Sequence, residues 1–295
     1  MTAATTNPEE RPVSTVSTSS TPSSAAAPAS EAAAAHASQF ALLSQRRFAP
    51  FFATQFLGAA NDNVFKYAFT LLVTYHAAQF TTLAPALAVN LIAGLFILPF
   101  LLFSATSGQL ADKFDKARLM QLVKALEVAI MLLGAVGFWL HSFVILLACT
   151  FLMGLHSTLF GPVKYAYLPQ VLRGGEIVGG NGLVEMGTFV AILVGTIVAG
   201  TLVEAGPNGH LYAAATCVAL ALAGLATSLA IPAAPSADPR LSIDWNPLRV
   251  TWANVQVARH ERAVFLSLLG ISWLWFFGAV FLTQFPQFAR ETLGG

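Results

Sequence analysis

Charged residues are scarce in this sequence of 295 residues. Asp, Glu, Lys and Arg together make up 10% of it, whereas a soluble domain carries about 25%. Hydrophobic residues make up 56%, and the mean hydropathy is +0.68. This composition excludes an ordinary soluble domain and indicates a membrane protein. The net charge is only +1, and no basic stripe with interleaved aromatics occurs, so we expect no nucleic-acid partner.

Cysteine and catalytic motifs are scarce as well. Cys149 and Cys217 both fall inside apolar segments, so we expect them to be packing residues, with no disulfide framework and no metal site. No Walker phosphate loop occurs. None of the six histidines has an Asp at the spacing, roughly five residues, that a glycerolipid acyltransferase uses. We therefore expect no enzyme and no cofactor within these residues.

Residues 1–40 contain few bulky apolar side chains and are rich in Ala, Ser, Thr and Pro. Such a segment buries too little apolar surface to offset the entropy of ordering, so we expect a disordered tail. It does not resemble a signal peptide, because no basic stretch precedes a short apolar core.

Long apolar runs begin after the tail, and a helix of about 20 residues crosses the hydrocarbon layer. We expect a six-helix transmembrane bundle over 41–231, a cytoplasmic linker over 232–262, and a seventh transmembrane helix that starts a second bundle over 263–295. The seven expected spans are 48–76, 86–110, 119–140, 142–165, 181–204, 211–231 and 263–289.

Lys and Arg are distributed unequally between the two sets of connections. The short connections 77–85, 141 and 205–210 contain none. By the positive-inside rule, this asymmetry predicts a cytoplasmic amino terminus. The basic side carries Arg46, Arg47, Lys113, Lys116, Arg118, Arg173, Arg240, Arg249, Arg259 and Arg262.

The linker 232–262 contains a helix signal of its own. Residues 244–247 offer a helix start, and Leu248, Trp252 and Val255 then share one face. Two readings stay open: a short amphipathic helix at the cytoplasmic membrane interface, or a solvated linker.

The connection between the second and third spans reads "GQLADKFDKAR", residues 108–118. It resembles the cytoplasmic loop motif of the major facilitator superfamily, although Asp115 stands where a second glycine is usual and Ala117 where a base is usual. The resemblance implies a clasp that closes the cytoplasmic side, whereas the simpler reading is a charged loop that only enforces topology. In the clasp, Gly108 permits close helix approach, and the polar contacts come from Asp112, Lys113, Lys116 and Arg118.

Four further segments carry a narrower resemblance. They are "QFLGAANDNVFKYAF", "FGPVKYAYLPQ", "GNGLVEMGTFVAILVGT" and "SLLGISWLWFFGAVFLTQFP", in that order. Together they resemble the bacterial lysophospholipid transporter family over residues 46–295. The resemblance implies an all-α major facilitator fold, of which six helices plus a seventh are the first half, and we expect a longer open reading frame or a truncated chain.

Charges inside the spans are the best site candidates, because each costs about 2.5–3.5 kcal/mol at a helix centre. Asp62 lies roughly 21 Å along the first span, near the midplane. Lys66, four residues later, can face it. This pair is either a structural neutralisation or part of a site in which Asp62 meets a cationic head group. The resemblance implies a functional acid here, and Asn61 and Asn63 are expected to hydrogen bond to neighbouring helices.

Lys164, near the end of the fourth span, and Glu185, near the start of the fifth, are expected to meet. Lys164 would hold a lipid phosphate, and Glu185 would compete for it in the empty carrier. The alternative is that Lys164 reaches the interface and Glu185 caps its helix. Lys124 and Glu127 are expected to form a local pair near the cytoplasmic interface.

The seventh span is crowded with aromatic residues, which we expect to face lipid or neighbouring helices. Thr283 and Gln284 are its polar exceptions, and we place them toward the cavity. Some members of the family carry an arginine in this helix that pairs with the acid of the first span. None lies within 263–289.

These features predict a transporter in the bacterial inner membrane that moves lysophospholipid, chiefly lysophosphatidylethanolamine, to the inner leaflet for re-acylation by alternating access. Its expected partners are the lysophospholipid substrate, membrane lipids and, as the resemblance implies, a fused or associated acyltransferase. Two alternatives stay open: a small-molecule or drug/proton antiporter with Asp62 as the proton carrier, and a non-transporting membrane anchor of a fused acyltransferase.

Overall fold

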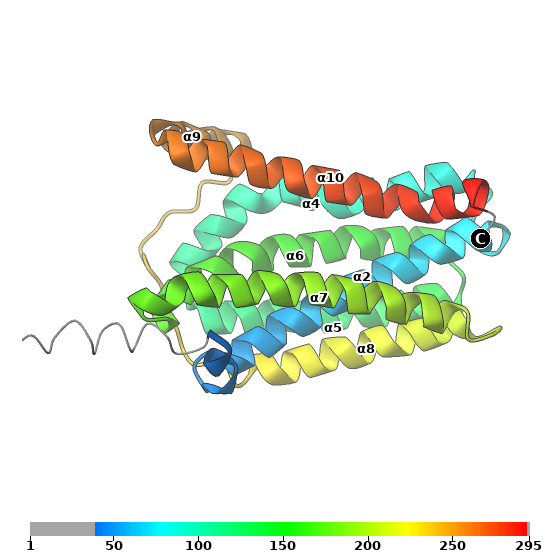
Figure 1. Ribbon diagram of the computed structural model, residues 1–295, viewed down its shortest axis with the longest axis horizontal. Coiled ribbons are helices and arrows are strands. Elements are labelled where there is room, and N and C mark those ends of the chain that lie inside the picture. The colour runs from blue at the N-terminus through cyan, green and yellow to red at the C-terminus, as the bar shows by residue number, and fades with distance from the viewer. Residues whose placement is uncertain (1–38, 294–295) are drawn as a thin grey trace, which may run out of the picture. The chain divides into compact units, whose positions relative to one another are not determined.

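The computed structural model describes residues 39–293. Within this range the chain forms helices and no strand, as the sequence predicts (Figure 1). Residues 1–38 of the expected tail lie outside the described range. The last two residues of the expected tail, 39 and 40, begin a 3₁₀ helix, η1 (Gln39–Ser44), whose Leu42 is buried.

Seven long helices correspond to the seven expected spans. The first, fourth and sixth connections between these long helices also contain short helices, α3 (Ala77–Phe80), η2 (Gly174–Glu176) and the linker helix α9 (Pro247–His260). The long helices are α2 (Ala49–Tyr75), α4 (Pro85–Lys113), α5 (Lys116–Trp139), α6 (Phe143–Val171), α7 (Ile177–Val203), α8 (Gly209–Ser228) and α10 (Arg262–Thr292).

Six of the described helices are long and apolar enough to cross a membrane: α4, α5, α6, α7 with η2, α8 and α10. Helix α2 is long enough, but its polar residues 61–63 and Lys66 lower its hydropathy. This helix packs against α7, α8 and α4. It is therefore enclosed by protein more than the helices that face lipid are. A helix enclosed in this way tolerates polar side chains because they meet partners instead of hydrocarbon.

The apolar core runs along α2, α5 and α6. Phe65, Phe69 and Phe138 are fully buried in it, and the rings of Phe65 and Phe138 meet edge to face at 5.6 Å. Cys149 and Cys217 are buried in the same cluster. These contacts hold the helices that carry the charged residues.

Close helix approach occurs at Gly154 and not at Gly108. A Cβ atom at Gly154 would lie 2.2 Å from the main-chain oxygen of Phe96, so glycine lets α6 contact α4 directly. A Cβ atom at Gly108 would meet nothing within 4 Å among the described residues, so no helix of this part of the chain lies against it.

One end of the bundle, here called the basic end, holds the α4–α5 connection and the segment after α8. Asp115 caps α5 by accepting a hydrogen bond from the Arg118 amide at 2.9 Å, and its other oxygen accepts from the Ala234 amide at 3.2 Å. The buried Lys116 donates to the Pro235 carbonyl at 3.2 Å. The residue that departs from the loop motif therefore supplies the cap.

The remaining polar residues of this loop make different contacts. Asp112 contributes its main-chain oxygen, which accepts hydrogen bonds from the amides of Ala237 and Asp238, and its side chain is exposed. Among the described residues, the side chains of Lys113 and Arg118 form no ion pair. The loop thus holds the segment after α8, within its own half of the fold.

Helix α9 confirms the helix signal in the linker. Asn246 caps it by accepting from the Arg249 amide at 3.1 Å. Asp244 accepts from the Asn246 amide and from the Arg249 guanidinium, and these bonds hold the pKa of its carboxyl below the usual value. Leu248 and Trp252 are exposed, whereas Val255 faces α10.

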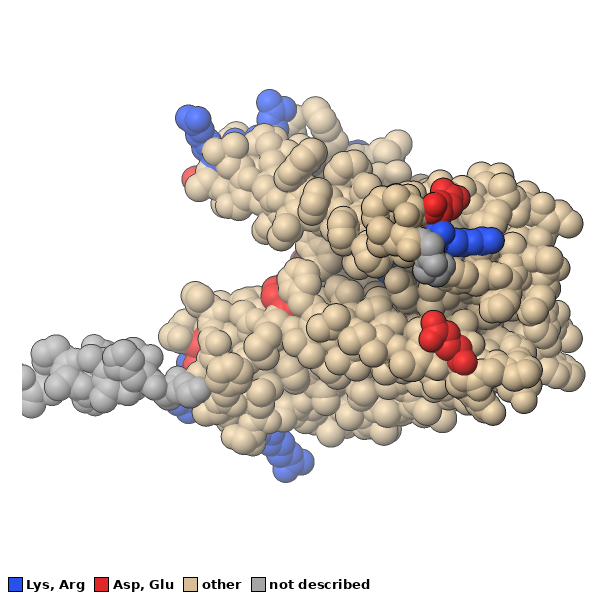
Figure 2. Space-filling view, turned by 45° about the vertical axis from the view of Figure 1, so that its right-hand side comes forward, with Lys and Arg blue, Asp and Glu red and all other residues tan. Residues whose placement is uncertain are grey.

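Helix α10 runs beside α4 and contacts the end of α2 (Figure 1). Figure 2 shows a hollow between the part formed by α9 and α10 and the rest of the helices. Trp275 of α10 reaches across to Phe189 of α7, and their rings stack at 5.7 Å and 9°.

Candidate functional site

A buried polar cluster joins α2, α5 and α6. Glu127 is its centre: one oxygen accepts from Asn61 Nδ2 at 2.6 Å, and the other accepts from Lys124 Nζ at 2.6 Å. His156 Nε2 lies 3.2 Å from that second oxygen. All four residues are at most 2% exposed. The carboxylate thus connects residues from three helices.

Packing around the ammonium explains how Lys124 is accommodated. A Cβ atom at Gly58 of α2 would lie 2.2 Å from Lys124 Nζ, so the glycine leaves room for the ammonium where it lies. The ring of Phe160 lies 5.0 Å from the same nitrogen and adds a cation–π contact. The expected Lys124–Glu127 pair is present, and it is enclosed by the bundle.

Asp62 lies beside this cluster and uses a different partner. Its Oδ2 accepts from the Ser157 hydroxyl at 2.5 Å, whereas its Oδ1 is buried and has no hydrogen-bond partner among the described residues. Lys66 forms no ion pair with it among the described residues, and the Lys66 ammonium lies 4.4 Å from the centre of the Phe96 ring on α4. Of the two readings of this pair, a direct structural ion pair is therefore not observed in the part of the chain that the structure describes.

The two asparagines of the first span differ. Asn61 bonds across helices to Glu127, as expected. Asn63 donates to the Ala59 carbonyl of its own helix at 2.7 Å, so the expected bond from Asn63 to another helix is wrong. Its Cβ packs against Gly195 of α7.

Lys164 and Glu185 meet, as the sequence predicts. The ammonium lies 3.9 Å from Glu185 Oε1, and the Tyr165 hydroxyl donates to the same oxygen. The Glu185 side chain is 37% exposed and that of Lys164 13%, so the pair is reachable from the surface. Phe189, one turn after Glu185, carries the stack with Trp275. An opposite-charge pair and an apolar aromatic wall therefore share one face of α7.

Gln284 lies on α10, where its amide donates to Asn90 of α4 at 3.1 Å. Helix α10 extends past the expected end at residue 289, and Arg290 belongs to it. Arg290 donates to the Thr74 carbonyl at the end of α2. Because Thr74 lies twelve residues after Asp62, about 18 Å along the helix, this arginine is not a partner of Asp62.

Sequence reasoning missed His156, Ser157 and Tyr165 as partners of the expected charges. His156 and Ser157 adjoin each other in an otherwise apolar span, and that local polarity was the available signal. Tyr165 directly follows Lys164, but its bond to Glu185 depends on how α6 and α7 pack. No local pattern reports that packing.

Seven long helices, most of them apolar on their outer faces, with charges enclosed among them, define a multi-pass α-helical membrane protein. The family model of the Major Facilitator Superfamily matches residues 51–295. The chain belongs to this superfamily.

Similar proteins narrow the comparison. The chain is 31% identical over 225 residues to the lysophospholipid transporter LplT of Serratia proteamaculans. The aligned region covers 75% of this chain and 52% of that protein. It is 33% identical over 230 residues to the protein of the same name from Citrobacter koseri, and this aligned region covers 76% of the chain and 52% of that protein. The chain thus spans about half the length of the curated relatives it matches.

Proposed function

We propose that this chain forms part of a carrier that moves lysophospholipid, with lysophosphatidylethanolamine as its substrate, to the inner leaflet by alternating access. The names of the similar proteins support the substrate class. The uneven distribution of Lys and Arg supports a cytoplasmic basic end and a cytoplasmic amino terminus in a bacterial inner membrane. An acyltransferase, fused or associated, is the partner that would consume the delivered lipid.

The Lys164–Glu185 pair is the observation that carries this proposal. A zwitterionic head group presents a phosphate to Lys164 and an ammonium to Glu185, so it replaces both halves of the pair. The adjoining Phe189–Trp275 stack offers an apolar surface to the acyl chain. Binding then separates two side chains on α6 and α7, which gives the loaded and empty carrier different contacts between these helices.

A second candidate function is supported by Asp62. One of its oxygens is buried and unpartnered among the described residues, and an added proton would neutralise the carboxylate. This observation favours a proton antiporter of the same superfamily, with Asp62 as the proton carrier. In the first proposal, Asp62 instead contacts the ammonium of the head group.

The test follows inward movement of labelled lysophosphatidylethanolamine by the full-length protein in proteoliposomes. We expect Lys164→Ala and Asp62→Asn to reduce the initial rate at least about tenfold, because each removes a charged contact. Arg240→Ala is the control, since Arg240 is exposed at the basic end and forms no ion pair among the described residues.

Two results separate the candidates. Movement of the lipid without a proton gradient, lost in Lys164→Ala, supports the lysophospholipid carrier. Absence of lipid movement by the wild-type protein, together with proton-driven export of small amphiphiles that requires Asp62, supports the antiporter. If inserted Lys164→Ala protein transports lipid at the wild-type rate, the assignment of the site is wrong.

A further inference from the structure

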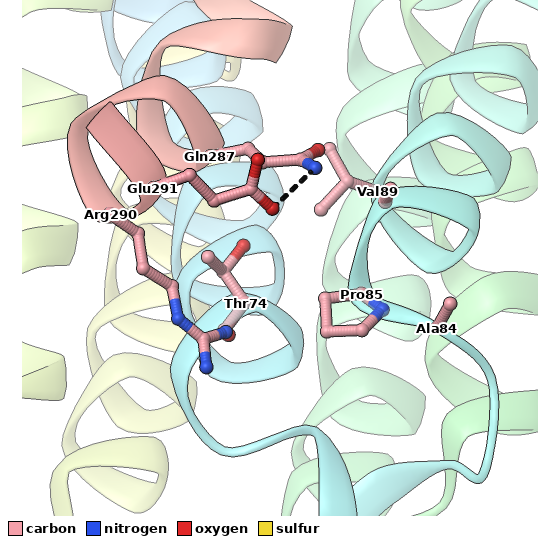
Figure 3. Close-up of a pocket in the computed structure, with 8 residues that line it drawn as sticks. Thr74, Ala84, Pro85, Val89, Gln287, Arg290 and Glu291 are labelled. Carbon is pink, nitrogen blue, oxygen red and sulfur yellow. Dashed lines mark hydrogen bonds between the residues drawn. The ribbon is translucent and has the colours of Figure 1, made fainter.

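A pocket lies at the end of the bundle opposite the basic end, between the last turn of α2, the first turns of α4 and the last turns of α10 (Figure 3). Its volume is about 380 Å³. One side is apolar and the other polar. The polar lining consists of Thr74, Gln287, Arg290 and Glu291, and the apolar lining includes Pro85 and Val89.

Arg290 is held in place by main-chain and aromatic contacts. Its guanidinium donates to the Thr74 carbonyl and lies 5.8 Å from the centre of the Tyr75 ring. Among residues 39–293, Arg290 forms no ion pair. A guanidinium has five N–H donors, so most remain available to an anion.

Glu291 supplies the opposite charge in the same pocket. It accepts from Gln287 Nε2 at 3.0 Å, and a carboxylate can accept further hydrogen bonds. Figure 3 shows the two charged side chains leaving α10 in different directions, with Arg290 toward Thr74 and Glu291 toward Gln287. The pocket therefore offers separate positive and negative groups.

This cation is unusual for its end of the molecule. The connections 76–84, 140–142 and 204–208, which lie at this end, contain no Lys or Arg. An anionic group that approaches from this side therefore meets the guanidinium of Arg290 before any Lys or Arg of the basic end. Arg binds phosphate through two parallel hydrogen bonds, which suits a fixed guanidinium.

We propose that this pocket is the entry site for the zwitterionic head group of a lysophospholipid, with the phosphate on Arg290 and the ammonium on Glu291. The inference rests on the proposed function and assigns the step that precedes binding at Lys164. The acyl chain lies on the exposed apolar face of α4 at Leu87 and Leu91. The next cation further into the bundle is Lys66 of α2, which lies about 12 Å along that helix from Thr74.

The test measures uptake by the full-length protein of lysolipid added to the side of the vesicle that this pocket faces. Arg290→Gln is expected to raise the half-saturating concentration of lysophosphatidylethanolamine about tenfold or more, with little change in the maximal rate. Arg290→Lys, which keeps the charge, should recover part of the loss. Arg262→Gln, an exposed arginine at the other end of α10, is the matched control.

Head-group chemistry provides an independent readout. Glu291→Gln should raise the half-saturating concentration for lysophosphatidylethanolamine and leave that for lysophosphatidylglycerol unchanged, because the latter has a phosphate but no ammonium. The same concentration shift for both lipids overturns the role of Glu291. If soluble glycerophosphoethanolamine, and not the lysolipid, depends on Arg290, the occupant is a free phosphodiester and the lipid assignment is wrong.

The outcomes also separate this site from the carrier function. If the Arg290→Gln and Arg262→Gln variants both transport lysophospholipid as efficiently as the wild-type protein, the entry site is wrong and the proposed function stays intact. A wild-type protein that moves no lysophospholipid overturns both.

Discussion

At the scale of the residue, the chain keeps a lysine and a glutamate wholly buried. Desolvation of two charges is expensive, and their attraction offsets it only when further hydrogen bonds are present. Glu127 has those bonds, since Asn61 donates to the oxygen that Lys124 leaves free. The carboxylate thereby ties α5 to α2, the helix that also carries Asp62.

Removal of one partner should therefore cost more than removal of both. Glu127→Gln leaves the Lys124 charge uncompensated and is expected to lower the free energy of unfolding by about 3–5 kcal/mol. The double variant Lys124→Met/Glu127→Gln should recover most of this loss. Thermal unfolding of the purified full-length protein in detergent measures both.

The matched control is Glu204→Gln, because Glu204 is exposed and forms no ion pair among the described residues. It should change stability by less than about 0.5 kcal/mol. A double variant as unstable as the sum of the two single variants would contradict the pairing argument.

At the scale of the element, the contact between α4 and α6 depends on one glycine. The Gly154 Cα faces the main-chain oxygen of Phe96 and the ring of Pro99, so the two helix backbones touch. Helix packing in lipid depends on such close contacts, because lipid tails are as apolar as the side chains. α4 and α6 also hold Phe96 and Ser157, the contacts of Lys66 and Asp62.

Gly154→Ala should force α4 and α6 apart, because the new methyl group meets main-chain atoms that cannot rotate away. We expect a loss of about 1–3 kcal/mol in stability, typical of overpacking. Gly161→Ala on the same helix is the control, since its Cβ would meet nothing within 4 Å. Melting temperatures of the two purified variants give the comparison; equal values would show that this contact does not limit packing.

At the scale of the whole molecule, the charge asymmetry and the up-and-down helix order predict which end of the bundle faces the cytoplasm. Residue 237 is exposed at the basic end, and residue 208 is exposed at the opposite end. The positive-inside rule places residue 237 in the cytoplasm. Both native cysteines are buried, so they provide a background with little labelling.

Single-cysteine labelling tests this orientation. A membrane-impermeant maleimide added to intact spheroplasts should modify Asn208→Cys and leave Ala237→Cys unmodified, whereas permeabilisation should expose both. Labelling of Ala237→Cys in intact spheroplasts would reverse the orientation and, with it, the direction proposed for transport.

Much of the fold was predictable because it follows from local chemistry. Apolar runs of sufficient length indicate helices wherever they occur, and the cap at Asn246 marks the start of α9. The site was predictable in part: Lys164 and Glu185 flank one short connection, so their proximity follows from topology. The separate contacts of Asp62 and Lys66 were not predictable, because i,i+4 spacing permits a contact between them without requiring it.

The sequence by itself determined the number and order of the membrane helices, the uneven distribution of positive charge and the identity of the buried ionisable groups. Only the tertiary structure decided the partners of those groups. Asp62 meets Ser157, Lys66 meets Phe96, and Glu127 meets Asn61. The physical reason is that each partner lies on another helix, and distances between helices depend on side-chain packing around the whole bundle, which a periodic pattern along one helix does not contain.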